Sequence, residues 1–189
     1  KYFDKKAYLT QSWQLHAEAL MYALEKIYTI APSFRAEKSR TLRHLAEYWH
    51  AEVELAWADA DEMMKVAEEL VSYVAQHVAK TCTKSLEHFK VDIKQLLIIK
   101  SPFERMSYDD AIKALQKKKF KIKWGEDMGA DEEKALMEGM EKPVFVTGYP
   151  RKVKAFYHMP DPKRTEITRS FDLLAPGVGE IIGGGQRIH

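Results

Sequence analysis

The sequence is poor in cysteine and has no long apolar segment. Its single cysteine, Cys82, excludes an intramolecular disulfide and a cysteine-based zinc site, and it is compatible with the reducing cytoplasm, where we expect the protein. No apolar run approaches the roughly 18 residues of a membrane-spanning helix, so we predict no membrane association. The charged start KYFDKKAYLTQS is not followed by an apolar core and therefore does not resemble a signal peptide.

An excess of charge of one sign is also missing. Thirty Lys and Arg against 28 Asp and Glu give a net charge of +2, whereas general nucleic-acid binding would show as a strong basic excess. The 189 residues, 46% hydrophobic and 31% charged, suffice for one globular domain with a core. Because the sequence starts without Met and stops inside an apparent strand, we expect 1–189 to be one partial domain of a larger polypeptide.

Charged residues concentrate in one segment, FRAEKSRTLRHLAEYWHAEVE, at 34–54. Its centre, EKSRTLR, has the composition of an exposed loop, and its flanks alternate as extended chain does. Two strands joined by a basic loop would present cations and carboxylates on one sheet face, which suits a polyphosphate beside a small zwitterion. Arg35 could fork two oxygens of a phosphate or carboxylate, or form a structural pair with Glu37. The loop cations Arg40, Arg43 and His44 could also be solvated charges.

The remaining pattern predicts an α+β fold, in which a mixed, mainly antiparallel sheet is flanked by helices. We expect a helix over 12–26 capped by Ser12, and a long helix over 59–88. Their predicted apolar faces are Leu15, Ala19, Leu20, Ala23 and Leu24 in the first and Met63, Ala67, Leu70, Val74 and Val78 in the second. Shorter helices are expected after Ser107, which Asp110 follows at capping-box spacing, and after Asp131.

Strands are expected at 26–30, 143–150, 152–159, 165–176 and 179–188, and Pro32 is expected to bend the chain. The basic run KKKFKIKW, at 117–124, has aromatic residues between its lysines. We interpret it as a helix end that turns into an amphipathic strand, in preference to a nucleic-acid-binding stretch.

A second polar segment, FDLLAPGVGEIIGGGQRIH, closes the sequence. Asp172 and Glu180 flank a Pro- and Gly-containing turn and could together hold Mg²⁺, which favours a few carboxylates plus phosphate oxygens. The glycines at 183–185 could let a ligand approach the backbone, or they could form a β-bulge. Near the other end, QSWQL offers Ser12 and Gln14 as neutral hydrogen-bonding groups; simple helix capping would explain Ser12 alone.

Taken together, these segments resemble the catalytic domain of class II aminoacyl-tRNA synthetases of the aspartate/asparagine subgroup. The segment at 34–54 is similar to motif 2, YFDKKAYLTQSWQL to the amino-acid-binding segment, and PVFVTGYP, KAFY and GEIIGGGQRIH to later strands of that subgroup. The resemblance covers essentially the whole sequence and implies the class II antiparallel sheet. It also implies a homodimer built through motif 1, expected before Lys1, and a motif 3 after His189; no anticodon-binding domain is found in the sequence.

The resemblance also assigns roles to individual residues. It implies that Arg35 holds the α-phosphate of ATP and the substrate carboxylate, and that Asp172 and Glu180 carry Mg²⁺. The other implied ATP-binding residues are Glu37, Arg43, His44, Tyr48 and Glu180. The other implied amino-acid-binding residues are Ser12, Gln14, Glu52 and Arg187. Catalysis in such a site needs positioning and charge stabilisation and no protein nucleophile.

Two positions favour asparagine over aspartate as the amino acid. Aspartyl enzymes of this subgroup carry a Lys in the helix after QSxQL and an Asp in the strand after motif 2, where this sequence has Ala17 and Glu52. Glu52 could accept from an amide NH₂ while Arg187 donates to its C=O, whereas aspartate would set two carboxylates together. At ~4 Å and an effective dielectric of about 20, that repulsion is roughly 4 kcal/mol.

The resulting expectation is ATP-dependent formation of asparaginyl-adenylate and transfer to tRNA(Asn), the activity of a ligase. One alternative is a relative of the archaeal asparagine synthetases of this family, which make asparagine from aspartate through an adenylate and without tRNA. A further alternative is a non-catalytic relative or fragment that binds a nucleotide. The intact set of Arg35, Glu37, His44, Asp172 and Glu180 argues against the last.

Overall fold

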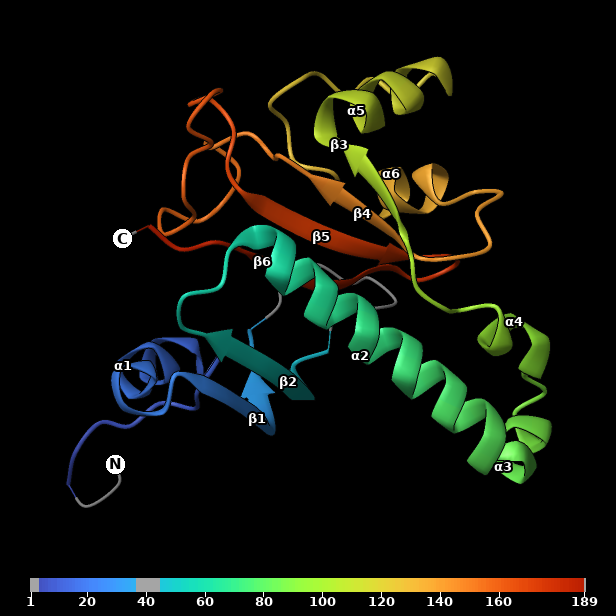
Figure 1. Cartoon of the computed structure of the whole chain (residues 1–189), viewed down its shortest axis with the longest axis horizontal. Helices are drawn as coiled ribbons and strands as arrows, with labels where there is room; N and C mark the ends of the chain where they lie inside the picture. Colours follow the sequence, from blue (N-terminus) through green and yellow to red (C-terminus); the bar gives the residue numbers. More distant parts are fainter. Residues whose placement is uncertain (1–3, 37–44, 189) are drawn as a thin grey trace. The chain divides into compact units, whose positions relative to one another are not determined.

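The computed structural model describes residues 4–36 and 45–188 and divides into two compact units, Lys1–Ala58 and Asp59–His189 (Figure 1). We describe each unit by itself. No helix within the described residues is long and apolar enough to cross a membrane.

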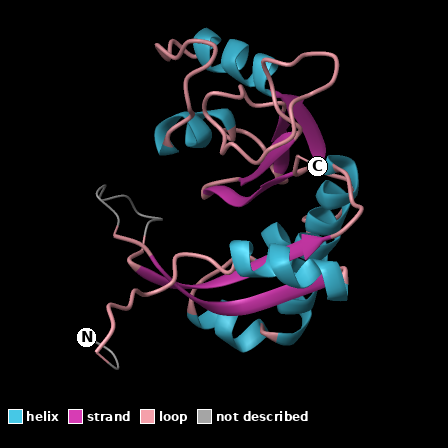
Figure 2. Ribbon diagram, turned by 90° about the vertical axis from the view of Figure 1, so that its left-hand side faces the viewer, coloured by secondary structure: helices cyan, strands magenta, loops and turns pink. Residues whose placement is uncertain are grey.

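The first unit contains one helix and a two-stranded antiparallel sheet. Helix α1 (Gln14–Leu24) precedes strands β1 (Lys26–Phe34) and β2 (Glu47–Leu55), which run side by side as a long ribbon (Figure 2). The two strands flanking the predicted basic loop are therefore confirmed. Pro32 does not bend the chain as expected; it lies within β1 opposite Trp49, since a strand edge tolerates the missing N–H.

Helix α1 starts later than expected, and its predicted apolar face is not buried. Trp13 occupies the N-cap position and its side chain makes no capping hydrogen bond. Ser12 therefore lies one residue before the N-cap, but its Oγ still accepts a hydrogen bond from Gln14 N, the first N–H of the helix, at 3.0 Å. Ala17 is the buried residue of this helix, whereas Leu15 and Leu24 are 70% and 60% exposed. The small side chain of Ala17 lets the helix approach the strands closely, whereas Leu15 and Leu24 face solvent.

The second unit is built on a four-stranded sheet in the order β3–β4–β5–β6. The strands are β3 (Glu104–Ser107), β4 (Val144–Thr147), β5 (Ser170–Ala175) and β6 (Gly179–Gly185). Strands β3 and β4 are parallel and the other neighbours are antiparallel, which agrees with the predicted mainly antiparallel sheet. Two expected strands were wrong: the structure has turns and irregular chain over most of 152–159 and after α5 in 117–124. Strand β3 was not predicted.

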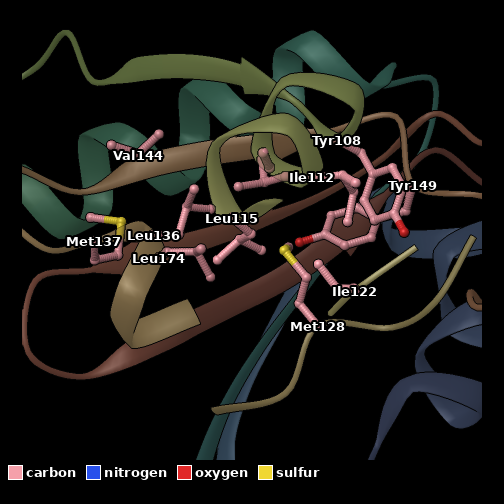
Figure 3. Packing of buried hydrophobic residues seen from close by; sticks show 12 residues of the cluster. Tyr108, Ile112, Leu115, Ile122, Met128, Leu136, Met137, Val144, Tyr149 and Leu174 are labelled. Carbon is pink, nitrogen blue, oxygen red and sulfur yellow. The ribbon is translucent and has the colours of Figure 1, made fainter. Parts of the chain in front are cut away.

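Helices of the second unit cover both faces of its sheet, and the alternation along β4 shows how. Val144 and Val146 pack in a cluster with residues of α5 (Tyr108–Lys117) and α6 (Ala130–Leu136). Phe145, between them, packs with residues of α2 (Ala60–Thr81) on the other face. Figure 3 shows the first cluster, in which the ring centroids of Tyr108 and Tyr149 are 5.2 Å apart. Helices α3 (Thr83–His88) and α4 (Ile93–Leu97) follow α2 in the chain.

The start of helix α2 is set by a capping box at Asp59. Asp59 accepts a hydrogen bond from Glu62 N, and Glu62 accepts one from Asp59 N, which forms a capping box. The predicted single helix to His88 is interrupted at Cys82. Its buried face is also offset from the predicted one, because only Ala67 is shared by both sets. The buried residues of α2 are Met64, Ala67, Glu68, Ala75 and Ala79.

Two shorter helices test the other predicted caps. Ser107 caps α5 by accepting a hydrogen bond from Asp110 N at 3.1 Å, as predicted. Asp131 does not cap α6; the helix follows Gly129, whose N–H donates to the Glu132 carboxylate at 3.1 Å, so Asp131 lies in the first turn.

Candidate functional site

The candidate residues of the first unit meet at Glu52. Its Oε1 accepts a hydrogen bond from Ser12 Oγ at 2.5 Å, and its Oε2 accepts one from Trp13 N at 2.9 Å. Ser12 Oγ in turn accepts from Gln14 N at 3.0 Å. The Glu52 side chain is only 10% exposed. Glu52 thus ties the segment before α1 to strand β2 across 40 positions of sequence, and this contact gives Ser12 a role that helix capping does not.

Tyr48, His50 and Glu52 alternate along β2 and so share one face of the strand. His50 Nδ1 is 3.2 Å from Ser33 Oγ and 3.5 Å from Glu52 Oε2, and the rings of Tyr48 and His50 are 5.3 Å apart. Burial lowers the pKa of His50, and Arg35 lowers it further against the opposing effect of Glu52. His50 is therefore neutral at pH 7, and its contact with Glu52 is not an ion pair.

Arg35 and Gln14 lie at the two ends of this group. The Arg35 guanidinium is 5.5 Å from the centre of the Tyr48 ring, a cation–π contact, and Arg35 N donates to Ala46 O at 3.0 Å. Gln14 Nε2 donates to Glu18 Oε1 at 3.2 Å, one turn along α1. The structure thus brings Arg35 beside Tyr48 and Ser12 beside Glu52. The predicted residues Glu37, Arg43 and His44 lie outside the described residues.

Asp172 and Glu180, two candidate residues of the second unit, bring their carboxylates together next to Gly183. Asp172 on β5 is paired across the sheet with Gly183 on β6. A Cβ built on Gly183 would lie 2.7 Å from Glu180 Oε1 and 3.3 Å from Asp172 Oδ1. The two carboxylates predicted to bind Mg²⁺ therefore converge on one backbone position, and the glycine leaves room for both. Among the described residues no group of three or more His, Cys, Asp or Glu side chains could hold a metal ion.

The other two glycines of the run serve packing. A Cβ on Gly184 would lie 2.7 Å from the Phe171 ring, and one on Gly185 would lie 2.8 Å from Arg169 O. On the side to which these two Cβ atoms would point, β6 is thus occupied by the protein's own atoms. The approach of a ligand to the partly exposed backbone at 183–185 stays a prediction. The register shift of this strand pair lies between the pairs Leu173–Ile182 and Leu174–Glu180, just before the glycines. The three glycines themselves pair in regular register with 170–172, so they do not form the bulge.

Asp172 forms an ion pair that the sequence analysis missed. Lys154 Nζ lies 2.8 Å from Asp172 Oδ1 and 2.6 Å from Oδ2, with the Lys154 and Asp172 side chains 18% and 9% exposed. Nζ also lies 4.0 Å from the centre of the Tyr149 ring. Burial and then the Asp172 charge raise the pKa of Tyr149, which keeps this phenol neutral. The sequence analysis placed Lys154 in the expected strand at 152–159 and gave it no role.

Arg187 lies at the other end of β6, where a bridge joins it to His158. Its guanidinium is 4.4 Å from the centre of the Tyr157 ring. Burial lowers the pKa of His158, with smaller contributions of the same sign from Arg187 and Lys154. The Arg187 guanidinium thus lies over the face of the Tyr157 ring, and this contact fixes the orientation of the guanidinium plane.

Comparisons with known proteins all point in one direction. The family model for class II tRNA synthetases (D, K and N) matches residues 1–189. The asparagine–tRNA ligase of Pyrococcus abyssi is 53% identical over 188 residues, which cover 99% of this chain and 43% of that protein. The chain therefore spans less than half the length of such relatives.

Solved structures agree. Asparaginyl-tRNA synthetase from Pyrococcus horikoshii complexed with asparaginyl-adenylate superposes with a TM-score of 0.95 at 52% identity, covering all of this chain and 44% of that one. The corresponding Entamoeba histolytica enzyme, also in complex with asparaginyl-adenylate, gives a TM-score of 0.87 at 39% identity, covering 100% of this chain and 43% of that one.

Proposed function

Because the chain belongs to the family of class II tRNA synthetases for aspartate, lysine and asparagine, we propose that it is part of the catalytic domain of an asparagine–tRNA ligase. The observation that carries the choice of amino acid is the 53% identity to an asparagine–tRNA ligase over almost the whole chain. The full-length protein would be a cytoplasmic homodimer that uses ATP, asparagine and tRNA(Asn).

The reaction has two steps. The carboxylate of asparagine attacks the α-phosphorus of ATP, a C–O–P anhydride bond forms, and the α–β phosphoanhydride bond breaks with release of pyrophosphate. A terminal hydroxyl of the tRNA then attacks the activated carbonyl carbon, the ester forms, the hydroxyl proton is lost, and AMP leaves. Both steps need reacting groups held in line and negative charge stabilised, and neither needs a protein nucleophile.

In the first unit, we assign the α-phosphate and the substrate carboxylate to Arg35. Its planar fork matches two oxygens of either group, and its stacking on Tyr48 fixes the plane of the guanidinium. Tyr48 would also stack on adenine. Glu37, Arg43 and His44 complete the proposed ATP-binding set from outside the described residues.

Glu52 is proposed as the residue that selects asparagine. Both of its oxygens already accept hydrogen bonds from Ser12 and Trp13, which fixes their positions. Each carboxylate oxygen has a second lone pair, so Glu52 could also accept from the amide NH₂ of asparagine. Aspartate would bring a second carboxylate against this buried one. Gln14 is assigned to the α-amino group, and Arg187 is proposed as a further amino-acid-binding residue.

Asp172 and Glu180 are the residues that would hold Mg²⁺. Their convergence above Gly183 fits an ion that takes one or two carboxylates and completes its shell with phosphate oxygens and water. When bound, Mg²⁺ supplies positive charge to the phosphates of ATP. The chain's contribution is to fix the two carboxylates on adjacent strands, where the missing side chain of Gly183 lets them meet.

Amino-acid-dependent exchange between pyrophosphate and ATP, measured on the full-length protein, tests the proposal. Asparagine should support exchange, aspartate should not, and tRNA(Asn) should accept asparagine in the second step. Exchange with aspartate, accompanied by formation of free asparagine and no charged tRNA, would instead identify an asparagine-synthesising enzyme. A full-length protein that binds ATP without exchange for either amino acid would refute an activating function.

A further inference from the structure

The ion pair between Lys154 and Asp172 involves both carboxylate oxygens and two largely buried side chains. Both oxygens of Asp172 lie within 2.8 Å of the same ammonium group, and little of either side chain reaches solvent. The aliphatic stem of Lys154 ends over the Tyr149 ring, which holds the ammonium in place. Screening by water is weak at such a site, so the pair is stronger than a surface salt bridge.

Other carboxylates surround this pair. Glu133, 4% exposed on α6, accepts a hydrogen bond from Glu180 N at 2.8 Å, and Glu180 Oε1 lies above Gly183 next to Asp172. Asp127 is near enough that Lys154 lowers its pKa, although burial and then the charges of Asp172 and Glu133 raise it. Lys154 is therefore a cation beside several acidic side chains, and its removal would leave Asp172 without the ammonium group that contacts both of its oxygens.

We propose that Lys154 is a positioning residue that occupies Asp172 as an internal counter-ion, so that a divalent cation binds there only together with a polyphosphate. A cation entering alone must approach an ammonium group that already contacts both oxygens of Asp172, and like charges at this range repel strongly. A nucleoside triphosphate removes the conflict, because its phosphate oxygens give the Lys154 ammonium a second anionic partner. The inference rests on the proposed role of Asp172 and Glu180 as metal-binding residues.

Binding of Mn²⁺ to the full-length protein, followed by electron paramagnetic resonance without nucleotide, tests the inference. The wild type should bind Mn²⁺ weakly, and Lys154→Met should bind one ion at least about tenfold more tightly, equivalent to about 1.4 kcal/mol. Lys152→Met removes the same charge from an exposed neighbouring position and should change nothing. The double variant Lys154→Met with Asp172→Asn should lose the gain. With a non-hydrolysable ATP analogue present, wild type and Lys154→Met should differ less.

Several outcomes would overturn the inference. These are tight nucleotide-free binding by the wild type, unchanged affinity in a folded Lys154→Met protein, or a gain that survives Asp172→Asn. Lys154→Gln gives the same comparison if the Met variant does not fold, and Lys154→Arg, which keeps the charge, should bind Mn²⁺ as weakly as the wild type. Because the readout is metal affinity, the Lys154 inference can hold in a protein that fails pyrophosphate exchange, and it can fail in one that passes.

Discussion

Replacing Glu52 by Gln separates charge from shape at the proposed selecting residue. Gln has the same length and can still accept from Trp13 N through its carbonyl oxygen, while its NH₂ can donate to Ser12 Oγ, which now acts as acceptor. The contact between β2 and the segment before α1 is therefore largely kept. What disappears is the negative charge that should exclude aspartate.

The size of the effect follows from the burial of Glu52. With the side chain 10% exposed, an aspartate carboxylate about 4 Å away would meet a poorly screened like charge, worth roughly 4 kcal/mol at an effective dielectric of about 20. We expect Glu52→Gln to lower the preference for asparagine over aspartate by about 100- to 1,000-fold.

The assay is pyrophosphate exchange with each amino acid, expressed as the ratio of the two kcat/KM values. This ratio does not depend on the fraction of folded enzyme, so a loss of stability cannot imitate a loss of selectivity. Glu47→Gln is the matched control, because it removes the same charge from an exposed position of β2. An unchanged ratio in Glu52→Gln would refute the selecting role.

Glu52→Asp completes the test. The charge stays, but the carboxylate is one methylene shorter and can no longer reach both Ser12 and Trp13. Activity with asparagine should fall while aspartate remains excluded. If Glu52→Asp instead became active with aspartate, discrimination would depend on the volume of the site and not on its charge.

The remaining predictions concern Arg35 and two structural features. Arg35→Ala should lower pyrophosphate exchange by at least about 100- to 1,000-fold, because the guanidinium that would stabilise negative charge on the α-phosphate is lost. Near-normal exchange would remove Arg35 from the mechanism. Gly185→Ala should destabilise the protein by about 1–3 kcal/mol in denaturant unfolding, since its Cβ would meet backbone atoms. Gly183→Ala should displace side-chain atoms, mainly the Glu180 carboxylate and to a smaller extent that of Asp172, and so reduce activity at nearly unchanged stability; equal stability losses in the two variants would contradict this. Ser107→Ala should cost about 1 kcal/mol by the same measurement, and no loss would show the cap to be dispensable.

Local patterns predicted those parts of the structure whose causes lie within a few residues. The cap at Ser107 needs only Asp110 N three positions away, and the alternation in β2 is visible in the residues themselves. The buried face of α2 was misread because the larger apolar residues suggested a core stripe. The structure buries mainly alanines, with Met64 and Glu68, and Leu70 and Val74 remain exposed. Small side chains permit close helix–sheet packing, which hydrophobicity alone does not reveal.

The sequence analysis proposed the candidate site residue by residue but did not foresee its internal contacts. Asp172, Glu180 and Glu52 were each expected to bind a ligand, and that role stays a prediction. In the structure Glu52 holds Ser12, 40 positions earlier, and Asp172 holds Lys154, 18 positions earlier. Such pairs depend on which segments the fold brings together, and no periodicity of the chain records them.

The contacts of Glu52 with Ser12 and Trp13 affect how the preference for one amino acid could be changed. A largely buried carboxylate without a partner would be costly, so Glu52, the proposed selecting residue, is stable only if the protein supplies donors of its own. The same donors, Ser12 Oγ and Trp13 N, belong to the segment proposed to bind the amino acid. If the proposed roles hold, a change at position 52 alters both the charge that the amino acid meets and the placement of the segment that binds it. Conversion of the preferred amino acid should consequently require compensating changes at 12–17 as well as at Glu52, and no single substitution should achieve it with full activity.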